Sequence, residues 1–594
     1  MNAYFTYALL RPSADPAALE GKFSDFAKQY IGPQFKSRLN MDYEALENSG
    51  DRYDMKLQAL ADIYLRSQGF YPHLGSVGDI RYVWMFSAVA IFILLIAMVN
   101  FINLSTARSA NRAKEVGVRK VIGSVRRQLV EQFLSESLVL SFLSVLLGVI
   151  IACIALPAFN EFSDKSLQMP FLSPVFLPAL LGTSLLIGLL AGLYPAFYLS
   201  AFQPIKVLKG QLSRGSKNGW LRSGLVVLQF AISVALIIAT LVVSQQMHYI
   251  QNKKLGFDKE QVLLINDAST LRNRFVAFED ALDNMPEVKS HTVSSFLPLD
   301  DGTRNSLVLY AEGQDPNTDQ VATQYWPSDE HYLPTLGIEL ANGRNFNPAI
   351  ASDSNSVIIN ETLAKKLGIA DDPINKRVVL PFDDGTLLTI IGVIKDFHYN
   401  SLREEIGGLC LVFGEDRNTI AIKTEAAQMQ QLIAKTEKLW SDMQPGTPFR
   451  YNFLDDKFAT LYAGEQSVGT TFSIFASLAI FIACLGLFAL AIFMIEQRKK
   501  EIGVRKVLGA SVANIVLHLN KQFAVLVLIA ALIAIPLSWY FMNQWLQDFS
   551  YSIELKWWVF LIGGIVALSI AILTVSTQSI KAALSNPIES LRSE

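Results

Sequence analysis

The sequence is poor in charged residues and in cysteine. Of its 594 residues, only 18% are charged and 51% are hydrophobic, whereas soluble proteins carry about 25% charged residues. The mean hydropathy is +0.31. Two of the three cysteines, Cys153 and Cys484, lie inside apolar runs and Cys410 stands alone. This pattern argues against a disulfide framework or a thiolate metal site, and the composition favours a membrane protein.

Motifs for catalysis and for metal binding are also missing. No G-x-x-x-x-G-K-[ST] loop is present to hold nucleotide phosphates, and "GKFSDF" (21–26) lacks the upstream glycine. Asp396 and His398 in "KDFHY" have no nucleophile beside them. The six histidines show no metal-ligand spacing; they are His73, His248, His291, His331, His398 and His518. We therefore predict no catalytic residue, no cofactor site and no metal site in this chain.

Seven apolar segments are each long enough to cross a bilayer, which takes about 20 residues. None of them contains Asp, Glu, Lys or Arg. They are Val83–Leu104, Leu138–Phe159, Phe176–Leu199, Ser223–Val243, Thr470–Ile495, Phe523–Met542 and Trp557–Val575. Seven such runs predict an α-helical integral membrane protein. Gln229 lies well inside its span, where we expect an interhelical hydrogen bond.

Positive charge collects in three of the connections between spans. The loop from Ser105 to Gln128 holds seven basic residues and one acid, and the loop from Ser200 to Arg222 holds five basic residues and no acid. The loop after Ile495 holds Arg498, Lys499, Lys500, Arg505 and Lys506. Basic loops remain in the cytoplasm, so crossing parity places residues 1–80 and 251–466 outside.

The long segment 251–466 is acidic and contains no spanning run. It has 20 Lys and Arg against 32 Asp and Glu. "VLLIND" (262–267), "SVIINE" (356–361) and "LLTIIGVI" (387–394) are rich in β-branched residues and predict strands. "ETLAKKLG" (361–368) and "AAQMQQLIAKTEKLW" (426–440) predict helices. We expect a large α/β extracytoplasmic domain.

One basic decapeptide is written twice. "KEVGVRKVIG" (114–123) and "KEIGVRKVLG" (500–509) share eight of ten residues and lie 386 positions apart. On a helix, Glu115 and Arg119 are four residues apart and can pair, and Gly123 is placed to end the helix. We expect a short amphipathic helix at the cytoplasmic membrane surface. Topology alone requires positive charge but not this residue order, so the repeat indicates a surface offered twice to the same kind of partner.

The repeat extends over whole halves of the chain, which predicts two parallel repeats of spans. After each decapeptide come two further spans and a Pro-Ile ending. The stretch 6–30 resembles 419–443 in outline, a strand followed by a helix. This register predicts about 195 residues upstream of Met1, including another span. The predicted parts are a remnant of a first external domain (1–80), three spans (81–210), one span (211–250), the external domain (251–466) and three spans (467–594).

These motifs resemble those of the FtsX/MacB-like family of bacterial ABC transporter permeases. The resemblance rests on both "E-[VI]-G-V-R-K" stretches and on "YLPTLGIELANGRNFN" (332–347), "SVIINETLAKKLG" (356–368) and "IIGVIKDFHYNSLREE" (390–405). The external part resembles the MacB-like periplasmic core domain, including its turn at Gly343, Arg344 and Phe346. The implied ATPase-coupling loops are 105–128 and 496–511. Their implied docking residues are Glu115, Gly117, Arg119, Lys120, Gly123, Glu501, Gly503, Arg505, Lys506 and Gly509.

The resemblance implies a permease subunit in the bacterial inner membrane. Its ATP and Mg would be bound by a cytoplasmic ABC ATPase dimer, a separate partner, and a periplasmic adaptor is also expected. A second copy of the chain, or a related permease, would complete the assembly. Two functions remain open at this point. One is export or extraction of an amphiphile such as a peptide, drug or lipoprotein; the other is mechanotransmission that activates an external enzyme without transport.

Overall fold

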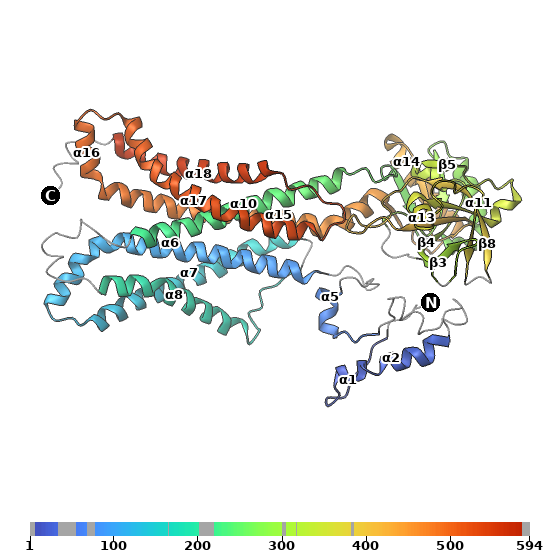
Figure 1. Cartoon of the computed structure of the whole chain (residues 1–594). Coiled ribbons are helices and arrows are strands. Elements are labelled where there is room, and N and C mark those ends of the chain that lie inside the picture. Colours follow the sequence, from blue (N-terminus) through green and yellow to red (C-terminus); the bar gives the residue numbers. More distant parts are fainter. Residues whose placement is uncertain are drawn as a thin grey trace. The chain divides into compact units, whose positions relative to one another are not determined.

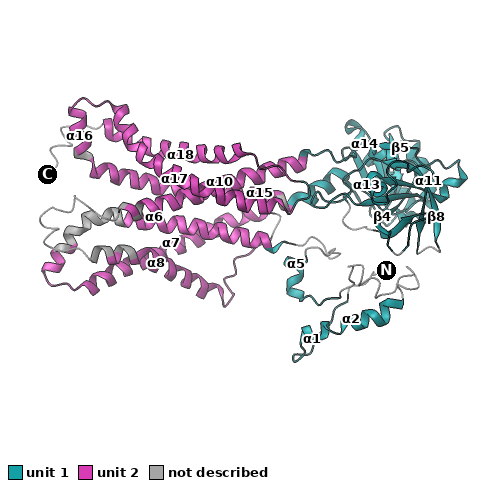
Figure 2. Ribbon diagram, in the orientation of Figure 1, with its two compact units in different colours: residues 1–80, 252–463, 549–551 teal, residues 81–251, 464–548, 552–594 magenta. Residues whose placement is uncertain are grey.

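The computed structural model describes residues 6–33, 55–67, 78–163, 166–200, 219–299, 305–316, 318–381 and 385–584. The chain forms two compact units (Figure 2). The helical unit comprises residues 81–251, 464–548 and 552–594, and the sheet unit comprises residues 1–80, 252–463 and 549–551.

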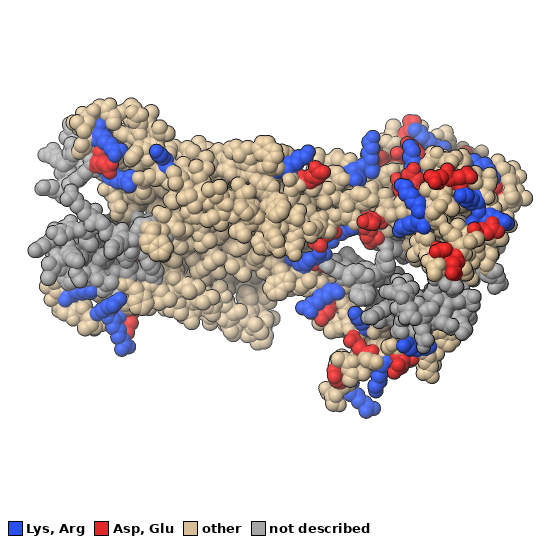
Figure 3. All heavy atoms as spheres, viewed as in Figure 1, with Lys and Arg blue, Asp and Glu red and all other residues tan. Residues whose placement is uncertain are grey.

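Seven helices in the described part of the chain are long and apolar enough to cross a membrane, as the sequence predicts. They are α6 (Ile80–Val121), α7 (Arg126–Ser163), α8 (Phe176–Ser200), α10 (Gly219–Asn252), α15 (Leu454–Gln497), α17 (Val512–Leu546) and α18 (Trp557–Leu584) (Figure 1). On the face seen in Figure 3, charged side chains gather toward the ends of the helical unit, and its middle is uncharged. The protein is therefore an α-helical membrane protein.

The two halves of the helical unit contain matching helix pairs. Helix α7 packs against α8, and α17 packs against α18. Close approach in the first pair requires Gly188 and Gly192, because an added Cβ would lie within 2.8 Å of the Leu138 side chain and 2.7 Å of Ser137 respectively. Small residues commonly permit such approach between membrane helices.

Helix α10 occupies the interior of the helical unit. Of its apolar window, 67% is buried, against 6% for α7 and 33% for α17. Its side chains Phe230, Val234 and Ile238 share one cluster with residues of α15, α17 and α18. The Gln229 side chain donates a hydrogen bond of 2.9 Å to the backbone oxygen of Ala483 on α15, which confirms the predicted interhelical bond.

The sheet unit contains a four-stranded antiparallel sheet in the order β11-β1-β10-β2. Its strands are β11 (Tyr451–Phe453), β1 (Val262–Ile265), β10 (Ile420–Lys423) and β2 (Ser290–Val293). The core of this layer includes residues of α11 (Phe275–Asp283) and α14 (Met429–Met443), with the Phe278 and Trp440 rings edge to face at 5.9 Å. The 3-10 turns η4 (Ala268–Arg274) and η6 (Ala426–Gln428) precede these two helices.

The second sheet of this unit has seven strands in the order β5-β8-β6-β9-β4-β3-β7, and β8 also pairs with β7. The strands are β3 (Ser306–Ala311), β4 (Val321–Ser328), β5 (Leu340–Gly343), β6 (Ser356–Asn360), β7 (Arg377–Leu380), β8 (Thr386–Ile394) and β9 (Gly408–Phe413). Helices α12 (Tyr332–Leu336) and α13 (Glu361–Lys366) and the turn η5 (Ala351–Asn355) connect them. The three predicted strands and two predicted helices are all present, as β1, β6, β8, α13 and α14.

The Gly-Arg-x-Phe turn after β5 is held by backbone geometry and one ion pair. Gly343 has φ +78°, and an added Cβ would lie 2.3 Å from the Ile391 oxygen. Arg344 donates two bonds of 2.6 Å to the fully buried Asp353 carboxylate, and Phe346 is buried. The turn therefore stabilises the domain.

The N-terminal stretch forms short helical pieces. They are α1 (Pro16–Glu20), α2 (Phe23–Phe26), η1 (Ala27–Ile31), η2 (Leu60–Asp62) and α5 (Ile63–Arg66). The strand predicted at its start is wrong for the described residues, because residues 6–10 adopt no regular structure. Its counterpart β10 lies between β1 and β2, and a lone strand without such partners gains too little to form.

Candidate functional site

The two copies of the repeated decapeptide end two helices at the same end of the helical unit (Figure 1). The first copy is the last part of α6, which continues unbroken from the apolar span. The second copy forms a separate helix, α16 (Lys499–Val507), after a break at Arg498 (φ −102°, ψ 11°). The expected short helix is therefore correct for the second copy and wrong for the first. We call residues 114–123 and 500–509 the two docking ends, after the role that the sequence predicts for them.

Both docking ends close with the same backbone hydrogen bonds. In the first, Gly123 N donates to Lys120 O (3.2 Å) and Ser124 N donates to Arg119 O (3.0 Å). In the second, Gly509 N donates to Lys506 O (3.1 Å) and Ala510 N to Arg505 O (3.0 Å). This is the Schellman motif, which needs a residue with positive φ after the helix. Gly123 and Gly509 have φ +109° and +92°, and the helix end predicted at Gly123 is confirmed.

Each docking end is anchored to its own half by an equivalent apolar cluster. The first cluster contains Val116, Leu129, Phe133 and Ala196, and the second contains Ile502, Ile515, Leu519 and Ala583. In each cluster, the first member comes from the docking end, the second and third come from the start of the next span, and the fourth comes from the end of the third span. The first three pairs are each 386 positions apart, which is the offset of the decapeptide itself. The repeat is therefore structural as well as sequential.

Polar contacts fix the basic side chains beside these clusters. Arg505 pairs with Glu501 (2.7 Å), and Arg119 donates to Gln132 Oε1 (2.8 Å). Lys506 donates to the Ala583 oxygen (2.7 Å) in the last turn of α18, where the helix dipole favours a cation. Partial burial, and then the nearby Arg126, lower the pKa of Lys120. The side chain of Glu115 and the surroundings of Gly117 lie outside the described residues, as does the basic loop 201–218.

The outer surface of each docking end includes exposed apolar side chains, although the decapeptide is basic overall. Val121 and Val507 are each 65% exposed, and Ile122 and Leu508 are each 80% exposed. Val118 and Val504 complete the two patches. Exposed apolar residues beside cations, repeated with equal exposure, suit docking of a protein partner. The helical register of V-R-K-V-[IL] was the available sequence signal for these residues.

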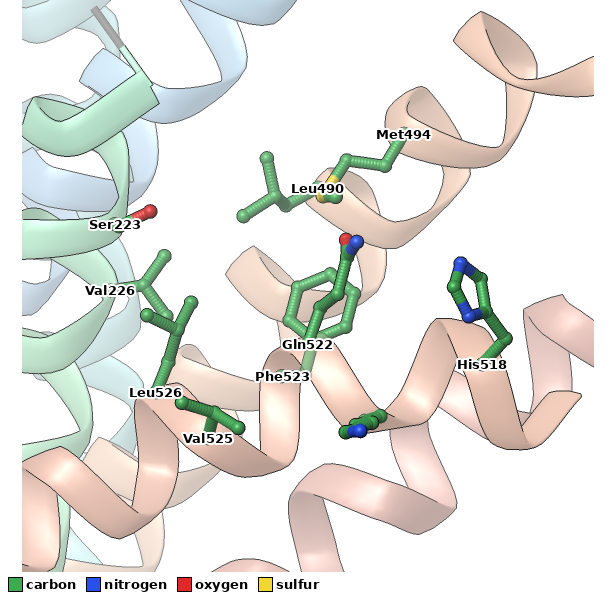
Figure 4. Close-up of a pocket in the computed structure, with 10 residues that line it drawn as sticks. Ser223, Val226, Leu490, Met494, His518, Gln522, Phe523, Val525 and Leu526 are labelled. Carbon is green, nitrogen blue, oxygen red and sulfur yellow. The ribbon is translucent and has the colours of Figure 1, made fainter.

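A cleft of about 630 Å³ in the helical unit is lined by the first part of α10, the last part of α15 and the first part of α17 (Figure 4). Val226 of α10, Leu490 and Met494 of α15, and Phe523 of α17 form its apolar wall. His518, Lys521 and Gln522 supply polar groups.

The sheet unit contains a junction at the segment Asp396–Arg403. This segment contacts the parts of the chain that connect the sheet unit to the helices. His398 N donates to Leu255 O (2.7 Å), just after α10. Leu402 N donates to the Tyr462 hydroxyl (2.7 Å), in the first part of α15. The Phe257 and Phe397 rings lie 6.1 Å apart. The segment, which we call the hub, therefore contacts both ends of the polypeptide that enters and leaves this domain.

The hub also contacts the connection between α17 and α18, whose residues 549–551 belong to the sheet unit. Ser550 Oγ donates to Arg403 O (2.8 Å), and the Arg403 guanidinium lies over the Phe549 ring at 5.0 Å. The Tyr551 ring lies edge to face with His398 at 4.6 Å. The chain connections of all four helices of the second half thus meet at one short segment.

The roles of Asp396 and His398 are structural in this geometry. Asp396 accepts bonds from Asn360 Nδ2 (2.8 Å), Thr362 N (2.9 Å) and Thr362 Oγ1 (2.8 Å), which fix the start of α13. Burial, and then Lys253, lower the pKa of His398 to about 4, so the ring packs uncharged at neutral pH. Within the described residues, no group of three His, Cys, Asp or Glu side chains is placed to hold a metal.

Models of two protein families match the chain. The FtsX-like permease C-terminal model matches residues 87–204 and again residues 473–587. The MacB-like periplasmic core domain model matches residues 223–438. The double match of the first model falls on the two halves that carry the docking ends.

Similar proteins include curated macrolide export ATP-binding/permease proteins MacB. The one from Neisseria meningitidis serogroup A is 25% identical over 298 residues, covering 46% of this chain and 44% of that protein. The one from Pasteurella multocida is 30% identical over 124 residues, covering 21% and 19%. The chain thus spans less than half the length of these relatives. The periplasmic region of MacB from Actinobacillus actinomycetemcomitans aligns with a TM-score of 0.26 and 15% identity over 36% of this chain and 97% of that one.

Proposed function

Since the chain belongs to the FtsX/MacB-like permeases, we propose that it is the permease subunit of a bacterial ABC transporter in the inner membrane. A separate cytoplasmic ABC ATPase dimer would bind ATP and Mg and dock on this chain. Closure of that dimer would move the helices and, through them, the extracytoplasmic domain. The moving domain would export or extract an amphiphile, such as a drug, peptide or lipoprotein, with a periplasmic adaptor as a further partner.

The observation that carries the proposal is the pair of docking ends. Each presents two cations beside an apolar patch of the same exposure, and each is braced by an equivalent cluster against two helices of its half. A partner that pushes on this patch therefore pushes on packed helices. Apolar anchors surrounded by charge are typical of protein interfaces.

The hub supports the second part of the proposal, transmission to the outside. It bonds to the chain beside α10 and α15 and to residues 549–551 between α17 and α18. Displacement of any of these helices would therefore reach the same eight residues of the external domain. The names of the curated relatives favour export over signalling, because they are macrolide exporters and macrolides are amphiphilic.

Charge reversal at the docking ends tests the proposal. Arg119→Glu with Arg505→Glu should reach the membrane at normal levels, because surface changes of this kind alter stability by about 0.5 kcal/mol. At an interface with acidic residues of a partner, the reversed charges cost several kcal/mol. We expect the cognate ATPase to be lost from affinity pull-downs, substrate-dependent efflux to fall with it, and each single variant to be partly impaired.

The matched control reverses Arg214 and Lys217 in the basic loop that is not repeated. This control should retain the ATPase and the efflux activity. Equal ATPase recovery from the two double variants would mean that the repeated cations serve membrane topology alone. ATPase binding that activates an external hydrolase without efflux would instead support the signalling function.

A further inference from the structure

Helices α6 and α15 face each other with equivalent side chains. One cluster contains residues of both helices at successive steps of four and three positions. On α6 these residues are Tyr82, Phe86, Val89, Ile93 and Ile96; on α15 they are Val468, Phe472, Phe475, Ala479 and Ile482. Every α15 residue in this set lies 386 positions after its α6 counterpart, so the same stripe of the repeat is used on both sides.

Two of the equivalent pairs contact each other directly. The Phe86 and Phe472 rings lie 5.6 Å apart. Fourteen residues further along each helix, Asn100 meets its counterpart Gly486, where an added Cβ would lie 1.8 Å from Asn100 Oδ1. Residues meet their own counterparts only where a two-fold axis passes, as in an isologous dimer interface. Two such points define a pseudo-two-fold axis between the halves.

Asn100 fixes the register of this contact. Its Nδ2 donates a hydrogen bond of 2.6 Å to the Ile482 oxygen, next to the oxygen that Gln229 bonds. A single polar residue in an apolar seam is a known device for setting the register of paired helices. Only glycine fits opposite, so the Asn100–Gly486 pair selects one alignment of the two stripes.

We propose that the α6–α15 contact is a dimer interface contained within one chain. A single polypeptide then supplies both permease halves and uses no second copy of itself. Each half offers one docking end, so one chain takes two ATPase subunits. The stoichiometry rests on the function proposed above, whereas the internal interface rests on the helix contacts alone.

The proposal replaces the expected pairing with a second copy or a related permease. In a two-chain assembly, the stripe at Phe86 and Val89 would face the same stripe of another molecule. Here Val89 and Ile96 are buried against α10 and α15 of their own chain. The surface that would receive a second permease is therefore already covered.

Cross-linking tests the interface in the full chain. With Cys153, Cys410 and Cys484 replaced by alanine, Phe86→Cys and Phe472→Cys are combined with a protease site inserted between Arg214 and Lys217. A short bifunctional thiol reagent should join the two halves, which stay together after cleavage and run at the mass of one chain. Single-cysteine variants are the control and should separate. A cross-linked product of doubled mass would overturn the proposal.

A residue exchange tests the axis independently of cysteine chemistry. Gly486→Asn alone sets two asparagines against each other and should abolish the cross-link or lower the membrane level of the chain. Adding Asn100→Gly exchanges the pair across the axis, so the amide introduced at position 486 would reach the oxygen of Ile96, the counterpart of Ile482. Recovery in the exchanged variant is expected. An exchanged variant no better than Gly486→Asn alone would refute the axis.

The mass of the purified protein in lipid nanodiscs, measured by native mass spectrometry, tests the copy number. We expect one chain alone, and one chain with two ATPase subunits in the complex. Two chains per particle would overturn the proposal. One chain that cross-links internally but retains no ATPase would uphold the internal interface and refute the proposed function instead.

Discussion

His398 shows at the scale of one residue how the hub depends on an uncharged ring. The imidazole packs edge to face on Tyr551 and is buried beside Lys253. Burial first, and then the lysine, lower its pKa to about 4, against about 6.5 in an unfolded chain. Below pH 6.5 the unfolded chain takes up a proton that the folded chain does not. The stability that this histidine contributes is therefore complete above pH 6.5 and falls as the pH drops toward 4.

This argument predicts a pH-dependent loss of stability that one substitution removes. Between pH 7 and pH 5 the external domain should lose on the order of 2 kcal/mol through His398. His398→Phe keeps the ring contact but cannot titrate, so its loss over this range should be smaller by that amount. Pulse proteolysis in urea on the purified full chain measures both values.

Two other histidines of the external domain bear on the comparison between the original protein and His398→Phe. His291 acts in the opposite direction, because the burial that lowers its pKa is outweighed by Glu279 and Asp283, which raise it. Its contribution is the same in both proteins and cancels. His331 is more than half exposed and lies outside the hub, so His331→Phe is the control and should not remove the loss that His398 causes. An unchanged dependence in His398→Phe would show that another group is responsible.

At the scale of elements, the docking ends depend on glycines with positive φ. An added Cβ at Gly123 or Gly509 would meet nothing within 4 Å, so alanine there costs only the backbone strain of about 1–2 kcal/mol. We predict that Gly509→Ala frays the end of α16 and speeds amide exchange in residues 505–510 up to about tenfold. Asparagine, which reaches positive φ more readily, should have a smaller effect.

Hydrogen exchange with mass spectrometry on the full chain measures this fraying. Gly148 is the matched control, because it lies inside α7 with nothing within 4 Å of an added Cβ and no positive φ. Gly148→Ala should not speed exchange. Exchange at the α16 end as slow in Gly509→Ala as in the original protein would contradict the Schellman assignment.

Elements with strong periodicity or hydropathy could be predicted from the sequence, and contacts between them could not. The seven spans, β1, β6, β8 and the ends at Gly123 and Gly509 follow from local patterns. The unbroken continuation of α6 into the first copy was missed, because the charged residues that end its apolar run do not end the helix. Asn100 was missed because its importance comes from Gly486, 386 positions away. The hub was missed because Tyr551 and His398 are far apart in the sequence and come into contact only in the folded domain.

At the scale of the whole molecule, we predict that the two docking ends share one side of the membrane. Charge asymmetry predicts that this side is the cytoplasm. Ile122→Cys and Leu508→Cys, each replacing a side chain that is 80% exposed, should therefore resist a membrane-impermeant maleimide in intact cells and react after permeabilisation. Asp319→Cys, at an exposed position of the external domain, should react in both. Labelling of Leu508→Cys from outside would reverse the orientation of the second half.

The Asn100–Gly486 contact also bears on the order of events in the history of this chain. On the axis of a homodimer a residue faces itself, so a symmetric ancestor could place asparagine against asparagine or glycine against glycine, but never one against the other. The unlike pair found here can be encoded only after the two copies had become separate coding sequences. Duplication of the half must therefore have preceded the substitution that now distinguishes the copies, and each half has since been free to specialise.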